Sequence, residues 1–243
     1  MKITKFKSLY QMSYLSGLFS INIYLVDEGE QLTLIDSGLP FLTSEILAFS
    51  DKLQKPISNI ALTHCHFDHI GGLQSLRKKL PNAKIYIPAR EVRILNGDYS
   101  LEQSEPQIPL KGGYPKNKNI PFDGTVKHRD RIESLTAIST PGHTPGSISY
   151  YSISDGFLLT GDAMQTKGGV AVAGKINWRY PFPALATWSK ELSLKSAQSI
   201  LDLNPKAIGP GHGNLLFDPQ LKLEKAITDL KKKIGGFDGS HAS

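Results

Sequence analysis

The segment of residues 64–69, His-Cys-His-Phe-Asp-His, most constrains how this chain can fold. It contains three of the seven histidines in the chain. An apolar run at residues 60–63 precedes it, and Ile-Gly-Gly-Leu at residues 70–73 follows it. We therefore predict a buried strand that ends in a short polar loop, from which a helix begins. Such a loop can direct several side chains to one point, which a strand or a helix alone could not do.

The residue types in this segment indicate a metal site. Neutral imidazole nitrogens and a carboxylate are ligands for zinc and similar first-row metals. A single histidine here would be explained as a polar group satisfied at a strand end. Three histidines and an aspartate within six residues favour a metal, because burying so many titratable groups without a partner is costly. Cys65 lies between two of the histidines, so we predict that its side chain points away from them and packs in the interior.

Three later segments repeat the arrangement of an apolar run, a glycine and a polar side chain. His143 follows the apolar run at residues 132–138, Asp162 follows Leu158-Leu159, and His212 follows Ala207-Ile208. Each lies beside a glycine, which lets the backbone turn tightly. Because the ends of neighbouring strands meet at one rim of a sheet, we expect these side chains to converge on residues 64–69.

In order along the chain, His-x-His-x-Asp-His, Gly-His, Gly-Asp and Gly-His resemble the motifs of the metallo-β-lactamase superfamily, from about residue 20 to about residue 215. The resemblance implies an α/β fold, a four-layered αβ/βα sandwich with two metal ions at one edge between two sheets. It also implies ligands for each ion and one bridging aspartate. These are His64, His66 and His143 for the first ion, Asp68, His69 and His212 for the second, and Asp162 as the bridge.

Two such ions, two Zn²⁺ in the simplest case with iron or manganese as alternatives, would make the protein a hydrolase. Divalent ions roughly 3.5–4 Å apart share a water and lower its pKa, which makes hydroxide available near pH 7. We expect Asp162 to neutralise part of the metal charge and Asp68 to accept or transfer a proton as the catalytic carboxylate. Asp36 lies where the family has an acidic turn, which implies that it orients a ligand histidine. The alternative is a helix N-cap or turn aspartate.

Differences among the branches of the superfamily reduce the number of functions that the resemblance allows. True β-lactamases lack the bridging aspartate, Asp162 here, and flavin-linked diiron reductases replace the second histidine, His66 here, by glutamate. Glyoxalase II-like thioesterases carry a helical C-terminal domain, whereas we predict about one helix after His212. Acyl-homoserine lactonases place a tyrosine where this chain has Gln165. Apart from the short C-terminal region and Gln165, the chain is most similar to the small lactonase and glyoxalase II-like branch.

We therefore predict a zinc hydrolase that cleaves a small carbonyl compound: an ester, lactone, thioester or amide. One alternative is a phosphodiesterase or nuclease of the same fold, for which Lys167, Lys175 and Arg179 are the basic residues near a ligand in sequence. Another is a mononuclear iron enzyme similar to persulfide dioxygenases, which share the first motif. The sequence leaves the substrate and the oligomeric state open.

Length and composition predict one domain, residues 1–243, with a disordered tail at about residues 235–243 that includes His241. Apolar runs alternate with helical patterns, which is typical of an α/β fold. We predict a hairpin at residues 28–30 and helices around residues 185–200 and 223–234. The predicted strands are residues 21–27, 31–35, 57–63, 83–88, 132–139, 147–153 and 156–159.

The formal charge of +6 arises from 28 basic and 22 acidic residues, and lysine-rich runs end two predicted helices. No aromatic side chains interleave with those runs, so nucleic acid is not indicated as a partner. No segment is apolar for long enough to span a membrane, and a single cysteine permits no internal disulfide. We therefore predict a cytoplasmic protein with a small-molecule substrate. Residues 96–129 and 168–182 are predicted to form the pocket walls, with an aromatic cluster packed on the core as the alternative, and His128 is predicted to be exposed to solvent.

Overall fold

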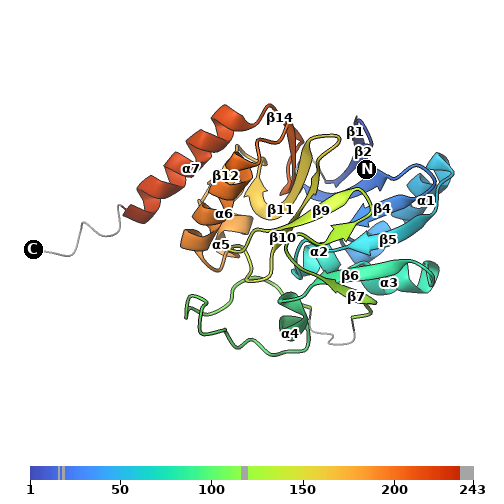
Figure 1. Ribbon diagram of the computed structural model, residues 1–243, viewed down its shortest axis with the longest axis horizontal. Helices are drawn as coiled ribbons and strands as arrows, with labels where there is room; N and C mark the ends of the chain where they lie inside the picture. Colours follow the sequence, from blue (N-terminus) through green and yellow to red (C-terminus); the bar gives the residue numbers. More distant parts are fainter. Residues whose placement is uncertain (16, 18–19, 116–119, 236–243) are drawn as a thin grey trace, which may run out of the picture.

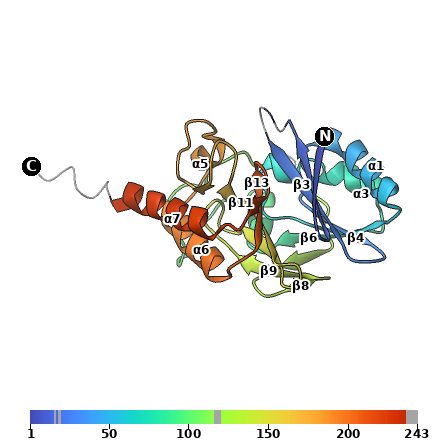
Figure 2. The same ribbon diagram turned by 90° about the horizontal axis from the view of Figure 1, so that it is seen from above.

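Two β-sheets pack face to face, and helices cover the outer face of each sheet (Figure 1). Figure 2 shows one group of helices on either side of the molecule, with the strands between them. The predicted α/β sandwich of four layers is therefore confirmed. The computed structural model describes residues 1–15, 17, 20–115 and 120–235, so the predicted tail lies almost wholly outside the described residues.

Seven strands form the first sheet, in this order across it: β1 (Lys2–Phe6), β2 (Leu9–Tyr14), β3 (Ile21–Asp27), β4 (Leu32–Ile35), β5 (Ile57–Ala61), β6 (Lys84–Pro88) and β7 (Gly124–Val126). Strands β1 to β4 pair antiparallel, and β4 to β7 pair parallel. The predicted hairpin joins β3 to β4, where the Glu28 N–H donates to Gln31 O at 2.9 Å.

The second sheet has the order β14 (Leu216–Phe217), β13 (Ala207–His212), β11 (Phe157–Gln165), β10 (Ile148–Ser152), β9 (Leu135–Ser139) and β8 (Arg131–Ile132), with β12 (Ala171–Val172) paired to β11. Strands β11 and β13 are parallel, and their ladder shifts register twice between Leu159 and Gln165. Asp162 lies inside this irregular stretch, which turns its side chain out of the regular alternation of the strand.

The helices are η1 (Pro40–Leu42), α1 (Thr43–Leu53), α2 (Phe67–Ile70), α3 (Leu73–Lys79), α4 (Glu91–Leu95), α5 (Phe182–Leu185), α6 (Lys190–Asp202) and α7 (Gln220–Gly235). Three apolar cores lie between the four layers. One packs α1 and α3 on the first sheet, one fills the space between the sheets, and one packs α6 and α7 on the second sheet. Successive side chains of β3 alternate between two cores: Ile23 and Leu25 face the helices, and Tyr24 and Val26 face the other sheet.

Three predicted elements differ from the structure. The strand predicted at residues 132–139 is a hairpin of β8 and β9, because Glu133 adopts a left-handed conformation with φ of 50°. The strand predicted at residues 156–159 continues as β11, so Asp162 lies within a strand rather than after one. The helix predicted around residues 185–200 is divided into α5 and α6 because the Ser189 hydroxyl caps α6, accepting a hydrogen bond from the Leu192 N–H.

The carboxyl ends of β4, β5 and β13 bring polar side chains to one rim of the sandwich. Asp36 directly follows β4, residues 64–69 follow β5, and His212 is the last residue of β13. Both sheets therefore contribute to the same cluster. Among the described residues, every helix is too short or too polar to cross a membrane.

Candidate metal centre

Residues 62–66 connect β5 to α2, so the segment of residues 64–69 spans the end of this loop and the start of the helix, as the apolar pattern predicted. His66 is the extended N-cap residue of α2, so Asp68 and His69 lie in its first turn. The ring centroid of His64 is 4.8 Å from that of His66 and 4.1 Å from that of His69. Cys65 is fully buried in the core between the first sheet and its helices, as predicted. The loop thus places three imidazoles on one side and the thiol on the other.

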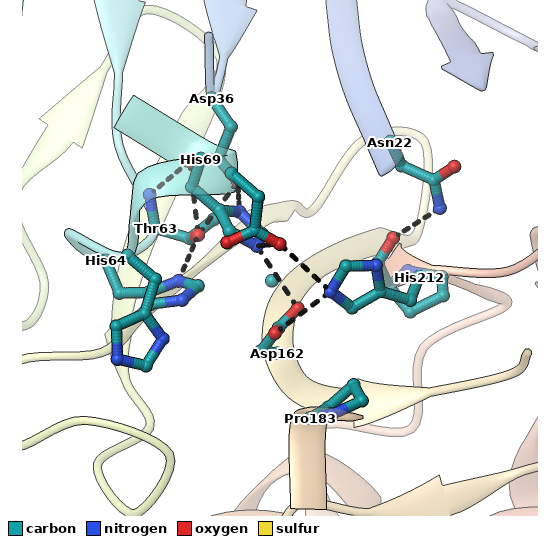
Figure 3. A network of polar contacts seen from close by, with 12 residues as sticks. Asn22, Asp36, Thr63, His64, His69, Asp162, Pro183 and His212 are labelled. Atoms are coloured by element: carbon teal, nitrogen blue, oxygen red, sulfur yellow. Dashed lines mark hydrogen bonds and ion pairs between the residues drawn. The ribbon is translucent and has the colours of Figure 1, made fainter. Parts of the chain in front are cut away.

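Asp162 lies at the centre of the cluster (Figure 3). Its Oδ1 is 3.3 Å from His69 Nε2, and its Oδ2 is 3.4 Å from His143 Nε2 and 3.2 Å from His212 Nε2. All seven predicted ligand side chains therefore converge, with donor atoms within 4.8 Å of one another in each group. We call His64, His66 and His143 the first subsite, and Asp68, His69 and His212 the second subsite.

In the first subsite, each ring has one nitrogen engaged by the protein. His66 Nε2 donates to Lys111 O at 3.0 Å. His64 Nδ1 lies 3.1 Å from the Thr63 hydroxyl, and His143 Nδ1 lies 3.2 Å from the Thr187 hydroxyl. Both hydroxyls donate their hydrogen elsewhere, to Asp36 and to Pro183 O, so each must accept from the histidine. The remaining nitrogens, His64 Nε2, His66 Nδ1 and His143 Nε2, consequently present lone pairs to the subsite.

In the second subsite, each histidine ring also has one nitrogen held by a protein acceptor, but the acceptors are different. His69 Nδ1 donates to Asp36 Oδ2 at 2.7 Å, and His212 Nδ1 donates to Ser20 O at 2.6 Å. Their Nε2 atoms face carboxylates: His212 Nε2 is 3.4 Å and His69 Nε2 is 3.7 Å from Asp68 Oδ2. Asp36 also accepts from the Thr63 N–H at 2.8 Å, so one carboxylate orients His69 and holds the end of β5.

The donor set fits divalent metal ions. His66 Nδ1 and His143 Nε2 lie 2.9 Å apart, although the hydrogen bonds described above leave both as lone pairs. Two lone pairs at this distance repel unless a cation lies beside them. In addition, His64 Nε2 is buried without a hydrogen-bond partner among the described residues, and His69 Nε2 and Asp162 Oδ1 face each other at 3.3 Å without hydrogen-bond geometry. Buried polar atoms are rarely left this way in proteins, and imidazole and carboxylate are ligands for zinc and related ions.

The two subsites differ in protonation. In the first subsite, burial lowers the pKa of His64 and His66 below the ordinary value and lowers that of His143 to about 3. In the second subsite, burial also opposes the charged form, but nearby carboxylates outweigh it. Asp36, Asp162 and Asp68 raise the pKa of His69, and Asp162 and Asp68 raise that of His212 to about 10.

A cavity of about 220 Å³ opens onto the cluster. Residues 168–182 contribute Tyr180 and Phe182, and residues 96–129 contribute Gly113, so both predicted wall segments reach it. Trp178 does not: its side chain is 87% exposed, and it borders a different depression. His128 is exposed, as predicted. Apart from the ligands, the cavity is lined by Phe67, Gly113, Tyr180, Phe182, Pro183 and Ala186.

Close backbone approach explains two glycines at the rim. A Cβ on Gly211 would collide with Asp162 Oδ1, and a Cβ on Gly112 would collide with the His66 ring. Gly112 also has a φ of 95°, which side chains rarely adopt. The segment around Gly112 therefore packs directly on a candidate ligand, and it supplies the carbonyl that accepts from His66 Nε2.

Sequence reasoning missed the residues that hold the loop of His212. Asn22 donates to Pro210 O at 2.8 Å and to Gly213 O at 2.7 Å, and the Tyr24 hydroxyl donates to Pro210 O at 2.7 Å. Gln11 donates to Gly213 O at 2.8 Å. These side chains leave β2 and β3 of the first sheet and satisfy carbonyls that flank a ligand at the end of β13. A polar residue inside an otherwise apolar strand, as Asn22 is, was the available signal.

Comparison with known proteins places the chain in a family. The sequence model of the metallo-beta-lactamase superfamily matches residues 16–212, which include every predicted ligand. The Bacillus subtilis (strain 168) protein YobT is 44% identical over 96% of this chain and 100% of its own length. The probable metallo-hydrolase YflN of the same organism is 29% identical over 88% of this chain and 87% of its own length.

A solved structure supports the fold. TTHA1623 in a di-iron-bound form superposes with a TM-score of 0.62 at 24% identity, over 86% of this chain and 95% of that chain. The match to the superfamily model extends over most of the chain and reaches from the β2–β3 connection to the last histidine of the cluster. This protein therefore belongs to the metallo-beta-lactamase superfamily.

Proposed function

We propose that this protein is a dinuclear metal hydrolase, with zinc as its metal and a small carbonyl compound as its substrate. The observation that carries the proposal is the orientation of the five histidines. Each has one ring nitrogen held by a protein acceptor and the other directed into the space around Asp162. Fixed tautomers of this kind are what metal-ligating histidines require.

The residues of the cluster would have distinct roles in binding metal and transferring a proton. The first subsite would hold one ion through neutral ligands, the second would hold another through Asp68 and two histidines, and Asp162 would bridge them. Such a pair supplies hydroxide near neutral pH and polarises the substrate oxygen. Asp162 offsets part of the positive charge. Asp68 is the candidate proton carrier because its side chain is 34% exposed and borders the cavity, whereas Asp162 is almost fully buried.

The cavity lining favours a carbonyl over a phosphodiester. Among the described residues that border it, none is lysine or arginine. The three basic residues near a ligand in sequence lie elsewhere: Lys167 donates to Gly17 O, Lys175 donates to Asp229 O, and Arg179 is exposed. These walls would give a phosphodiester no charge-assisted hydrogen bond from lysine or arginine, whereas apolar walls suit an ester, lactone, thioester or amide. That YflN is described as a probable metallo-hydrolase agrees with hydrolysis.

Metal analysis and a substrate panel test the proposal. Protein purified without chelators, with zinc restored if needed, should hold two zinc ions per chain. It should hydrolyse p-nitrophenyl esters, thioesters or lactones faster than bis-p-nitrophenyl phosphate or β-lactams. One iron per chain, with no hydrolysis, would instead support the iron dioxygenase alternative. A preference for bis-p-nitrophenyl phosphate would support the phosphodiesterase.

Two histidine variants provide a matched control. His143→Ala removes a ligand of the first subsite, so zinc content and hydrolysis should both fall. His128→Ala removes an exposed histidine in the segment before β8, so both should stay unchanged. Equal behaviour of the two variants would contradict a metal centre at this position.

A further inference from the structure

Glu91 is a fully buried acidic residue that the proposed hydrolysis does not use. It is the first residue of α4 and lies just beyond the end of β6. Its neighbour Arg90 pairs with Glu105, at 2.7 Å, rather than with Glu91. A carboxylate buried without a cationic partner costs free energy unless hydrogen bonds compensate for it. The hydrogen bonds that Glu91 accepts therefore indicate what this buried carboxylate does.

Both carboxylate oxygens of Glu91 accept hydrogen bonds from segments that carry metal ligands. Oε2 accepts from the Cys65 N–H at 3.2 Å, and Oε1 accepts from the Gly146 N–H at 2.8 Å. The Thr144 hydroxyl also hydrogen-bonds to this carboxyl group. Each of these three groups can donate, which suits a carboxylate that has acceptors and no donor.

The donors belong to the two loops that form the first subsite. Cys65 lies between His64 and His66, and Thr144 and Gly146 closely follow His143. The first loop leaves β5 of the first sheet, and the second precedes β10 of the second sheet. Glu91 therefore bridges two loops, one from each sheet, that together supply all three nitrogens of the first subsite.

The fit around Glu91 is close. A Cβ placed on Gly146 would lie 2.7 Å from both Cγ and Oε1 of Glu91, and 2.9 Å from its backbone nitrogen. Real Cβ atoms do not approach other atoms so closely, so the carboxylate reaches the second loop because residue 146 has no side chain. A side chain at residue 146 would therefore push the carboxylate away from this loop.

We propose that Glu91 is a positioning residue that sets the separation of the two loops of the first subsite. The inference rests on the proposed metal-binding function and assigns one further residue to it. The supports of the second subsite do not involve Glu91. Asn22 and Tyr24 hold the loop of His212, and Asp36 contacts His69 as well as the Thr63 hydroxyl beside His64. Removing the Glu91 bridge should therefore weaken one metal site and spare the other.

Glu91→Gln is the most selective test. It keeps the shape of the side chain but turns an amide NH₂ toward the N–H of Cys65 or Gly146, so one hydrogen bond becomes a repulsion. Glu91→Asp keeps both acceptors but is too short to reach both loops. Glu28→Gln is the matched control. Glu28 Oε2 also accepts a backbone N–H from the other sheet, that of Ser134 at 3.2 Å, but it lies at the β3–β4 turn away from the cluster.

Each protein would be stripped of metal and titrated with Zn²⁺ alone against a chromophoric chelator, and the unfolding temperature of each metal-free form would be measured. For Glu91→Gln we expect the affinity for one of two zinc ions to fall by about 10–100-fold, the usual effect of removing a group that orients ligands. The affinity for the other ion should not change. Glu91→Asp should show a smaller loss in the same step, and Glu28→Gln should bind both ions as the wild type does.

The outcomes separate the two proposals. A wild-type protein that binds no zinc would overturn the proposed function. Wild-type binding of two ions together with unchanged binding in Glu91→Gln would overturn the role of Glu91 alone. The role would also be overturned if both ions were weakened equally, or if Glu28→Gln lost as much affinity, because either result indicates general loosening of the fold. If Glu91→Gln does not fold, Glu91→Asp decides by the same titration.

Discussion

The two subsites use different means to prepare histidines for a metal. In the first, burial outweighs the nearby Asp162 carboxylate and keeps His64, His66 and His143 neutral, and hydroxyl and carbonyl oxygens orient the rings. The second surrounds His69 and His212 with carboxylates that favour their protonated forms. A cation entering the first subsite meets free lone pairs, whereas one entering the second must displace protons. The comparison indicates that ions bound at the two proposed subsites would differ in how their affinity depends on pH.

The largest effect is expected at Asp162, which belongs to neither subsite alone. Asp162→Asn keeps the shape but removes the charge that both subsites share. Hydrolysis should fall by about 10²–10⁴-fold, because positioning and charge balance at a two-metal site are worth several kcal/mol. Zinc content should fall below two ions per chain. Asp155→Asn, just before the other end of β11, is the control and should keep both properties. Near-normal turnover with both ions bound would remove Asp162 from the bridging role.

The second prediction separates the subsites by their supports. Asp36→Asn weakens the hydrogen bond to His69 Nδ1 and disturbs the Thr63 hydroxyl beside His64, whereas Thr187→Val removes only the partner of His143 Nδ1. Thr187→Val should lower the affinity for one zinc ion by about 10–100-fold, and Asp36→Asn should lower the affinity for both. Asparagine tolerates the left-handed backbone of Asp36, whose φ is 62°. Zinc titration of the double variant should show both steps weakened independently. A single shared step in all three variants would mean that the subsites do not act separately.

The third prediction is the effect of pH on the metal-free protein. The pKa of His212 is raised to about 10, so its stabilising charge is fully present below pH 6.5 and is lost as pH rises through about 10. The pKa of His143 is lowered to about 3, so the folded state loses stability as pH falls from 6.5 toward 3. Urea midpoints of chelator-treated protein should therefore decline on both sides of pH 6.5. His212→Gln should flatten the alkaline side and His143→Gln the acid side, and unchanged profiles would contradict this account.

The smallest effect is expected at Cys65, which lies between two ligands in sequence but packs in the apolar core. Cys65→Ala should leave hydrolysis and zinc content close to those of the wild type, because the Glu91 contact uses the backbone N–H of residue 65 rather than its side chain. Stability should fall by about 1 kcal/mol from the lost packing. Loss of activity with both ions bound would show that the thiol reaches the reaction.

The clustering of the candidate ligands could be predicted because their pattern is local. Three histidines and an aspartate in six residues, and a glycine beside each later member of the cluster, are visible without any knowledge of the fold. The layers could be predicted through the resemblance that these motifs carry. The residues that hold these side chains in place could not be predicted, because they bind backbone groups that are distant in sequence. Asn22 donates to a carbonyl 191 residues away, and Glu91 accepts from an N–H 26 residues away.

Two strand boundaries were predicted wrongly because sheet contacts outweigh local sequence preference. Glu133 turns the chain between β8 and β9 in a left-handed conformation that a glutamate does not signal, so two strands were predicted as one. Asp162 was placed after a strand because the apolar run ends at Leu159, whereas pairing with β13 continues through a shift of register. In both cases the contacts of the whole sheet outweigh the local preference of the residues.

The pairing of His66 with His143 also has a consequence for the lifetime of the protein. These residues lie on different sheets and are separated by 77 positions, and the chain has a single cysteine, so it cannot form an internal disulfide. An ion shared by the two loops would close a long loop much as a disulfide does, which in a chain-entropy estimate stabilises by about 4.5 kcal/mol. Unlike a disulfide, this closure would open whenever the ion leaves. Proteases should then degrade the protein faster as the free zinc concentration around it falls.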